Sequence, residues 1–70
     1  MDIQKHLSIT GSSNVSWKDA IIKAIEEASK SIDYLTSVEI IRQYADISGN
    51  KITAYFVDLD ISFAIDPNRK

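Results

Sequence analysis

Three acidic side chains in the second half of the chain are the ones best suited to binding a ligand. Asp58 and Asp60 alternate with Ser62 in the run Asp-x-Asp-x-Ser, and Glu39 lies in the preceding apolar segment. Carboxylate oxygens are preferred ligands of Ca²⁺, and the run superficially resembles an EF-hand loop, although the glycine and the final glutamate of such a loop are absent here. A strand would also hold alternate side chains about 7 Å apart. A calcium site at Glu39, Asp58 and Asp60 would therefore need carboxylates from more than one strand or subunit.

The same three acids have a second interpretation, as partners in salt bridges between subunits. A neighbouring copy offers the basic side chains Lys18, Lys23 and Arg42. We favour this interpretation over the metal site.

No enzyme activity is expected from this chain. It has one histidine and no cysteine, so it lacks a pair of side chains for nucleophilic catalysis. Its acids lie on an open sheet surface, without the apolar burial that tunes a general acid. His6 falls on the polar side of an end strand, and we give it no role.

Residues 52–65 form the element that must position two of these acids. From residue 55 onward every second residue is apolar, which predicts a strand with one buried face and places Asp58 and Asp60 on the other. At about 3.3 Å per residue the strand would be roughly 45 Å long, so several elements must cover it. The apolar positions are Tyr55, Val57, Leu59, Ile61, Phe63 and Ile65.

A second strand, residues 35–47, is joined to this one by a hairpin turn at residues 48–51, in which Gly49 and Asn50 are the two turn residues. On the buried side this register predicts that Val38, Ile40 and Tyr44 face Ile61, Leu59 and Tyr55. On the other side it predicts the pairs Ser37 with Ser62, Glu39 with Asp60, Ile41 with Asp58, and Gln43 with Phe56. Two facing acids destabilise a sheet unless a positive charge intervenes.

The first part of the chain predicts a strand and then a helix. Residues 3–10 place their apolar side chains on one face, and residues 11–14 form a turn cluster. Ser16 and Asp19 have the spacing of a capping box, and from Trp17 to Ile32 the apolar residues recur at helical spacing.

These elements together predict an α+β fold with the order β-α-β-β. The helix makes its two flanking strands parallel through a right-handed crossover, and the long strand fits between them. The sheet is then a three-stranded antiparallel sheet in the order 1-3-2, wrapped around one helix. One helix covers only one face, and we expect another subunit on the other face because it is too apolar for bare solvent. Its apolar residues are Ile41, Ala45, Ala54, Phe56 and Ala64.

Composition places the chain among small homo-oligomeric domains. Its 70 residues make a single domain, 1–70, and a core of this size supplies only about 3–5 kcal/mol of stability. Without cysteine, oligomerisation is the common remaining source of stability. A net charge of −2 and the lack of a basic tract argue against nucleic acid as a partner. No apolar run is long enough to span a membrane, and the N-terminus lacks a signal-peptide core, so we expect a cytoplasmic protein without membrane contact.

The order and spacing of these features resemble the dodecin family over nearly the whole chain. The segments that carry the resemblance are residues 10–13, 16–20, 28–32, 38–40 and 59–63. The resemblance implies a non-enzymatic protein in which twelve copies form a hollow dodecamer. It also implies that flavin, as riboflavin or FMN, binds in stacked pairs at the two-fold axes and is stored or buffered there.

The chain departs from flavin-binding dodecins at the residues of that site. Their stacking tryptophan corresponds to Ser37, and their glutamine at the edge of the flavin ring corresponds to Phe56. Arginines that hold the phosphate in some members correspond to Tyr44 and Ala64. A flavin would meet a small, polar wall at Ser37 and Ser62 unless Phe56 or Tyr44 stacks instead.

Three functions therefore stay open. The first is a flavin site rebuilt around Ser37, Tyr44, Phe56 and Ser62. The second is a dodecin-like shell that binds calcium or another ligand, since calcium dodecins also lack the tryptophan. The third is a purely structural shell.

Overall fold

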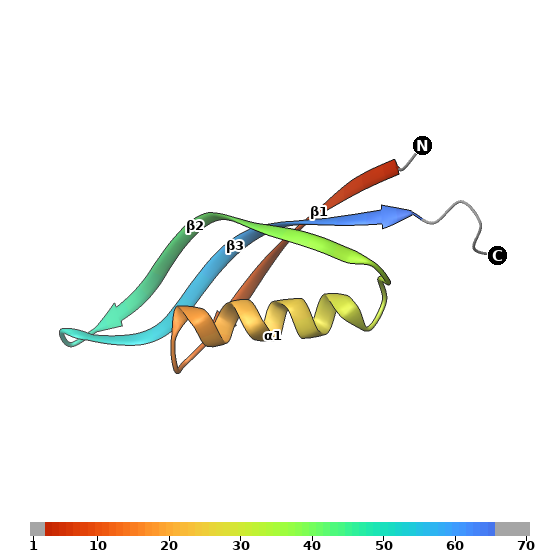
Figure 1. The fold of residues 1–70 in the computed structure, drawn as a ribbon. Coiled ribbons are helices and arrows are strands. Elements are labelled where there is room, and N and C mark those ends of the chain that lie inside the picture. Colours follow the sequence, from red (N-terminus) through yellow and green to blue (C-terminus); the bar gives the residue numbers. More distant parts are fainter. Residues whose placement is uncertain (1–2, 66–70) are drawn as a thin grey trace.

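β3 (Lys51–Ile65) is the middle strand of the sheet, as its length and alternation predict. In the computed structural model, which describes residues 3–65, β3 lies between β1 (Ile3–Ser13) and β2 (Leu35–Ser48) and runs antiparallel to both. A single helix, α1 (Trp17–Ser29), packs on one face of the sheet (Figure 1). The predicted α+β class and the strand order 1-3-2 are confirmed.

The core forms where the apolar side of β3 meets an alanine stripe on α1. Val57, Leu59 and Ile61 are each at most 1% exposed. They pack against Ala20, Ala24 and Ala28, whose spacing of four residues places them on one side of the helix. Because alanine is small, the helix axis can lie close to the sheet.

Gly11 lies where β1 passes closest to α1. A Cβ atom at this position would lie 2.7 Å from the carbonyl oxygen of Ala20 and 3.0 Å from the Cβ of Ala24. The glycine is therefore required for helix–strand packing and not for a turn. The predicted turn cluster at residues 11–14 is wrong in this respect, since β1 continues through Ser13.

Ser16 caps the start of α1. Its side chain accepts a hydrogen bond of 3.0 Å from the backbone N–H of Asp19, as predicted. The carboxylate of Asp19 accepts a hydrogen bond of 2.6 Å from the hydroxyl of Ser13 and pairs with Lys23 at 3.2 Å, so the capping box is only half formed. The helix ends at Ser29, three residues before the predicted limit at Ile32.

Trp17 joins the beginning of α1 to the hairpin. Its ring packs edge-on against Tyr55, with ring centroids 4.9 Å apart, and its Nε1 donates to the backbone carbonyl of Tyr44 at 3.0 Å. Trp17 is thus a packing residue, which is the role that its place in the apolar stripe indicates.

Register shifts at Ile41 and Thr53 alter the middle of the hairpin. The predicted pairs hold beside the turn and from Ser37 to Ile40, namely Ser37 with Ser62, Val38 with Ile61, Glu39 with Asp60, and Ile40 with Leu59. A further shift at Thr36 pairs Leu35 with Phe63. Ile41 is then an extra residue in β2 and Thr53 an extra residue in β3, and all pairs between them are displaced by one.

Three predicted pairs are wrong because of these two bulges. Tyr44 faces Phe56 and not Tyr55, Gln43 faces Val57, and Arg42 takes the place of Ile41 opposite Asp58. A displacement of one residue exchanges the two faces of a strand. Tyr44 and Arg42 therefore lie on the side away from the helix. Ala45 faces Tyr55 and lies on the helix side, where it was not expected.

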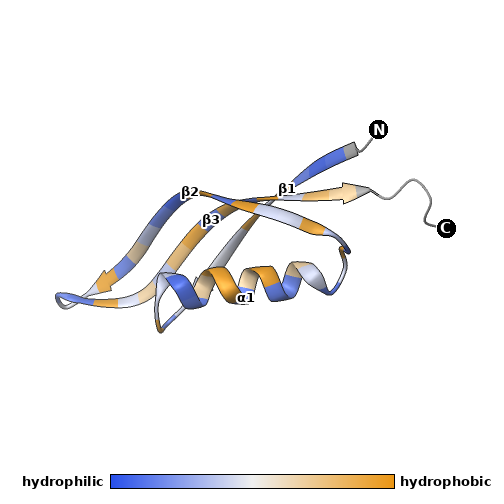
Figure 2. Cartoon of the chain, in the orientation of Figure 1, coloured by the Kyte–Doolittle hydropathy of each residue, from blue (hydrophilic) through white to orange (hydrophobic). Residues whose placement is uncertain are grey.

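α1 covers β1 and β3 and leaves most of β2 uncovered. Val38 and Ile40 lie on the helix side of the sheet but are 38% and 47% exposed. Figure 2 shows apolar residues along β2 and towards the end of the hairpin, which extends beyond the start of the helix. The described chain is elongated, with extents of 54 × 19 × 13 Å. Among residues 3–65, no helix is long and apolar enough to cross a membrane.

Candidate functional site

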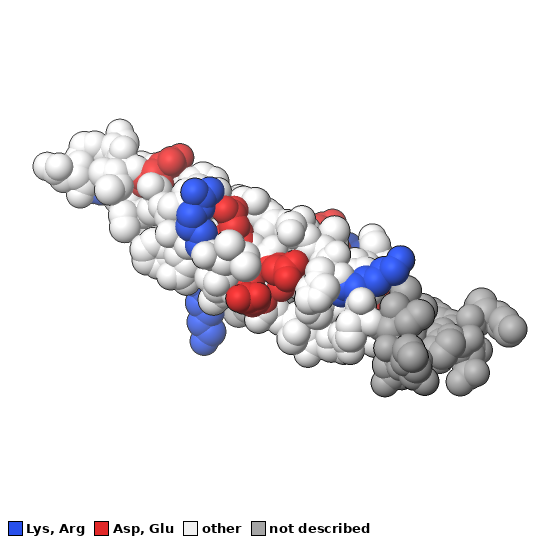
Figure 3. Space-filling model, turned by 90° about the horizontal axis from the view of Figure 1, so that it is seen from above, with Lys and Arg blue, Asp and Glu red and all other residues white. Residues whose placement is uncertain are grey.

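The face of the sheet opposite α1, here named the outer face, carries the predicted site residues. Phe56, Asp58, Asp60 and Ser62 follow one another at alternate positions of β3, flanked by side chains of β1 and β2. Figure 3 looks onto this side and shows acidic groups gathered near the middle of the molecule, with basic groups beside them.

Asp58 is the centre of a polar cluster on this face. Its Oδ1 accepts hydrogen bonds from the hydroxyl of Thr10 at 2.9 Å and from that of Tyr44 at 3.3 Å. Its Oδ2 accepts from Nε of Arg42 at 3.1 Å and lies 3.0 Å from Nη2 of the same side chain. β1, β2 and β3 thus all contribute to the cluster. The bulge at Ile41 makes it possible by bringing Arg42 and Tyr44 to this face.

The pKa of Asp58 is lowered from its ordinary value of 3.8. The hydrogen bond from Thr10 is the largest cause, with further contributions from Arg42 and Tyr44, while partial burial of the carboxyl acts in the opposite direction. Asp58 is therefore an ionised group whose charge is balanced by Arg42, and its hydrogen bonds connect β3 to β1 and β2 on the outer face.

Stability should accordingly depend on the charge of Asp58. Because the folded pKa lies below the unfolded value, the stabilisation is present above about pH 4 and is lost as the pH falls through the folded pKa. We expect Asp58→Asn to lower the thermal midpoint near neutral pH, and we expect the difference from the unaltered protein to shrink towards about pH 2. Thermal melts of both proteins across this range measure the effect. Glu26→Gln, on the exposed side of α1, is the control, and an Asp58→Asn difference that does not change with pH would contradict the prediction.

Tyr44 and Phe56 form a stacked pair next to this cluster. Their ring centroids are 5.2 Å apart at an angle of 14°, and Cζ of Arg42 lies 4.6 Å from the centroid of the Tyr44 ring. Arg42 therefore bonds to Asp58 and also covers one aromatic ring. The sequence register placed Tyr44 in the core, whereas the bulge turns it to the outer face.

The four residues predicted for a flavin site form two separate pairs within one chain. Tyr44 faces Phe56, and Ser37 faces Ser62. Phe56 and Ser62 are six residues apart on β3, a distance of roughly 20 Å along a strand. A single ligand would contact both pairs only if a second chain brought them together.

Glu39 and Asp60 face each other as predicted, but with Asp58 they do not form a metal site in one chain. Asp58 is already paired with Arg42. In the part of the chain that the structure describes, Glu39 forms no ion pair with a basic side chain. Residues 3–65 include no cluster of three or more histidine, cysteine or acidic side chains that could hold a metal ion.

His6 contacts two residues of β3, although we gave it no role from the sequence. Its Nδ1 lies 3.0 Å from Oδ2 of Asp60 and 3.1 Å from Oγ of Ser62. In a catalytic triad the acid and the serine bind different ring nitrogens of the histidine. Here both contact the same nitrogen, so the trio does not have the geometry of a nucleophilic site.

Thr10 and His6 are residues of this face to which we gave no role from the sequence, and Arg42 was expected as a salt-bridge partner from a neighbouring subunit and not from the same chain. Thr10 and His6 could have been found, since both lie on the polar side of β1 and the pairing with β3 brings them opposite Asp58 and Ser62. The pairing of Arg42 with Asp58 of its own chain could not have been predicted, because it depends on the bulge at Ile41.

The fold and the sequence together define the class of protein. The family model for dodecin matches residues 3–66, almost the full length, and this chain belongs to the dodecin family. Among curated proteins, the calcium dodecin of Mycobacterium tuberculosis is 34% identical over 68 residues, which cover 96% of this chain and 94% of that protein.

Solved structures show the same fold. A crystal structure of a Thermus thermophilus protein superposes with a TM-score of 0.91 at 22% identity, covering 97% of this chain and all of that one. The dodecin of Streptomyces davaonensis gives a TM-score of 0.87 at 22% identity, with 93% and 96% covered. The calcium dodecin of Mycobacterium tuberculosis, described as calcium chelating with a calcium-binding site, gives 0.79 at 29% identity, with 97% of each chain covered.

Proposed function

We propose that this chain is a non-enzymatic subunit of a hollow, twelve-subunit dodecin shell that binds a small ligand on its outer face. Membership of the dodecin family supports the shell, and the exposed apolar residues of β2 supply a surface that another copy would cover. The contacts of His6 argue against nucleophilic catalysis, as set out above.

The first candidate ligand is a calcium ion held by Glu39 and Asp60 of more than one subunit. The observation that carries this proposal is the pairing of these two acids across β2 and β3, where Asp60 contacts His6 but Glu39 has no basic partner among residues 3–65. Facing acids repel one another unless a cation lies between them. The identity to a calcium dodecin adds support.

Calcium titration of the purified protein tests this candidate. We expect weak binding, with a Kd on the order of 10⁻⁴ M, because few charged ligands are available. Glu39→Gln should weaken the binding by about tenfold or more, since calcium affinity depends on the number of charged ligands. Glu26→Gln is the control and should bind calcium as the unaltered protein does. Calorimetry would measure the affinities and light scattering the assembly. A twelve-subunit particle that binds no calcium would exclude calcium as the ligand but would support the proposed assembly.

Flavin is the second candidate, supported by the aromatic residues on the outer face. Tyr44 and Phe56 both lie there, although they already stack on each other. At the position of the family's tryptophan the chain has Ser37, which faces Ser62 and offers no ring for stacking. These residues fit a flavin poorly, and we expect weak binding of riboflavin or FMN.

Substitution of Ser37 by tryptophan should restore flavin binding. Stacking on an aromatic side chain is worth about 1–3 kcal/mol per ring in nucleotide complexes, so Ser37→Trp should tighten riboflavin binding by about tenfold or more. Quenching of riboflavin fluorescence on titration is the measurement, and Thr36→Trp, one residue earlier on β2, is the control. Tight binding by the unaltered protein that is lost in Phe56→Ala would instead mean that the Tyr44–Phe56 pair has taken over the stacking.

A further inference from the structure

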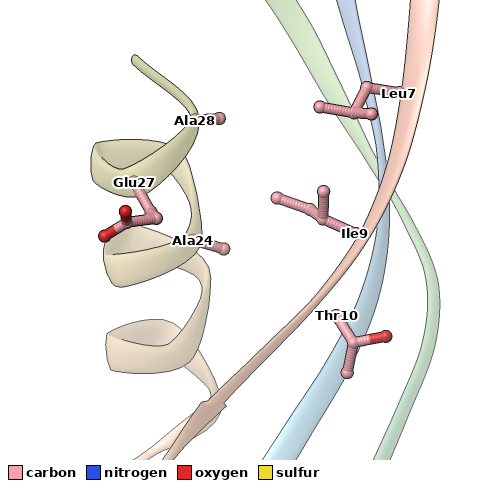
Figure 4. A pocket seen from close by; sticks show the side chains of 6 residues that line it. All are labelled: Leu7, Ile9, Thr10, Ala24, Glu27 and Ala28. Atoms are coloured by element: carbon pink, nitrogen blue, oxygen red, sulfur yellow. The ribbon is translucent and has the colours of Figure 1, made fainter. Parts of the chain in front are cut away.

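An apolar groove lies between α1 and β1 on the helix side of the molecule. Its volume is about 280 Å³. Figure 4 shows Leu7 and Ile9 of β1 pointing towards Ala24 and Ala28 of the helix. Leu7 is 37% exposed, and Glu27 is the acidic residue among those that line the groove.

The size and lining of this groove favour a protein side chain over a small molecule as its occupant. Pockets that bind small molecules usually measure about 300–1,000 Å³ and contain several convergent polar groups. This groove is smaller, and the hydroxyl of Thr10 is already bonded to Asp58. Glu27 is the charged residue at the groove, and Figure 4 shows its carboxylate at the rim, pointing away from Leu7 and Ile9, where only a long side chain of an occupant would reach it. An occupant should therefore be aliphatic and carry one positive charge.

The end of the β2–β3 hairpin, residues 47–52, has these two properties. Ile47 and Ile52 face each other across the strands and are 70% and 43% exposed. Lys51, which precedes Ile52, is also exposed. Figure 1 shows that the hairpin extends beyond the start of α1 and away from the rest of the chain.

We propose that residues 47–52 of one copy insert into the α1–β1 groove of another copy. Ile47 and Ile52 would pack on Leu7 and Ile9, and the ammonium group of Lys51 would pair with the carboxylate of Glu27. This inference rests on the multi-subunit part of the proposed function and does not depend on the ligand. Each copy has one hairpin end and one groove, so every subunit of a closed assembly can make the contact.

The hairpin end cannot occupy the groove of its own chain. Ile52 lies seven residues before Leu59, the partner of Ile9 on β3, which is roughly 23 Å along the strand. The salt bridge of 3.2 Å between Glu27 and Lys30 does not block the contact. Both side chains are largely exposed, at 76% and 70%, and exposed pairs of this kind contribute little to stability.

Charge reversal tests the proposed pairing of Lys51 with Glu27. Lys51→Glu and Glu27→Lys should each raise the concentration at which the assembly dissociates by about tenfold, because each brings like charges together at the contact. The double variant should return to within about threefold of the unaltered protein. Lys18→Glu combined with Glu27→Lys is the control and should not restore assembly. Mass measured by light scattering on dilution is the readout.

Cross-linking tests the contact directly, because the chain has no cysteine of its own. An Ile52→Cys variant mixed with a Leu7→Cys variant should form a covalent pair on oxidation, since a disulfide requires Cα atoms about 4–7 Å apart. Val15→Cys mixed with Leu7→Cys should not, although Val15 is 66% exposed. A multimer in which charge reversal is not rescued and the cross-link does not form would overturn the inference. A monomeric unaltered protein would overturn the multi-subunit proposal itself.

Discussion

Replacing Leu59 by alanine should lower the free energy of unfolding by about 2–5 kcal/mol, the usual range for a buried leucine. Leu59 is 1% exposed and packs in the centre of the core, against the alanine stripe of α1. A domain of this size has about 3–5 kcal/mol of stability from its own core, so the substitution should leave the isolated subunit close to unfolded.

The Leu59→Ala substitution should also disturb the outer face of the sheet. Asp58 and Asp60 flank Leu59 in β3, and its burial fixes the strand that presents them. Urea denaturation at one subunit concentration is the measurement, because assembly makes stability depend on concentration. Val15→Ala, at a position 66% exposed, is the control and should change stability by no more than about 0.5 kcal/mol. A Leu59→Ala protein as stable as this control would show that Leu59 is not a core residue.

Replacing Gly11 by valine should destabilise the protein by at least about 2 kcal/mol, because it overpacks a tight contact. The added Cβ would lie 2.7 Å from a backbone oxygen of α1, which cannot move aside as the end of a flexible side chain could. The helix would have to separate from β1. Thr10, the preceding residue of β1, would then be displaced from Asp58.

The second glycine provides a control for this prediction. Gly49 lies in the hairpin turn at a φ of 58°, and no atom lies within 4 Å of the Cβ that a side chain would add there. Asparagine tolerates this backbone conformation, so Gly49→Asn should change stability by only about 0.5 kcal/mol. Thermal denaturation followed by circular dichroism would compare the two variants. Equal stabilities would mean that the contact between β1 and α1 does not require a glycine at position 11.

The sequence by itself determined the elements of the fold and their order. The alternation of apolar residues in β3 predicted a strand with one buried face. The apolar stripe that begins at Trp17 predicted the helix that packs on that face. Gly49 and Asn50 both have positive φ values, as a two-residue hairpin turn requires, and the pairs next to the turn follow from them. These features are local, so a single sequence is enough to predict them.

Only the tertiary structure decided which side chains meet on the outer face. Ile41 and Thr53 are residues that a strand accepts in either a regular or a bulged conformation, and nothing in their types indicates a bulge. Ile41 nevertheless exchanges the faces of the residues after it, which brings Arg42 to Asp58 and Tyr44 to Phe56. The need for glycine at position 11 also became visible only in the tertiary structure, because it arises from the close approach of β1 to α1. In each case the outcome depends on packing between segments that are distant in the sequence, and the periodicity of one segment carries no information about it.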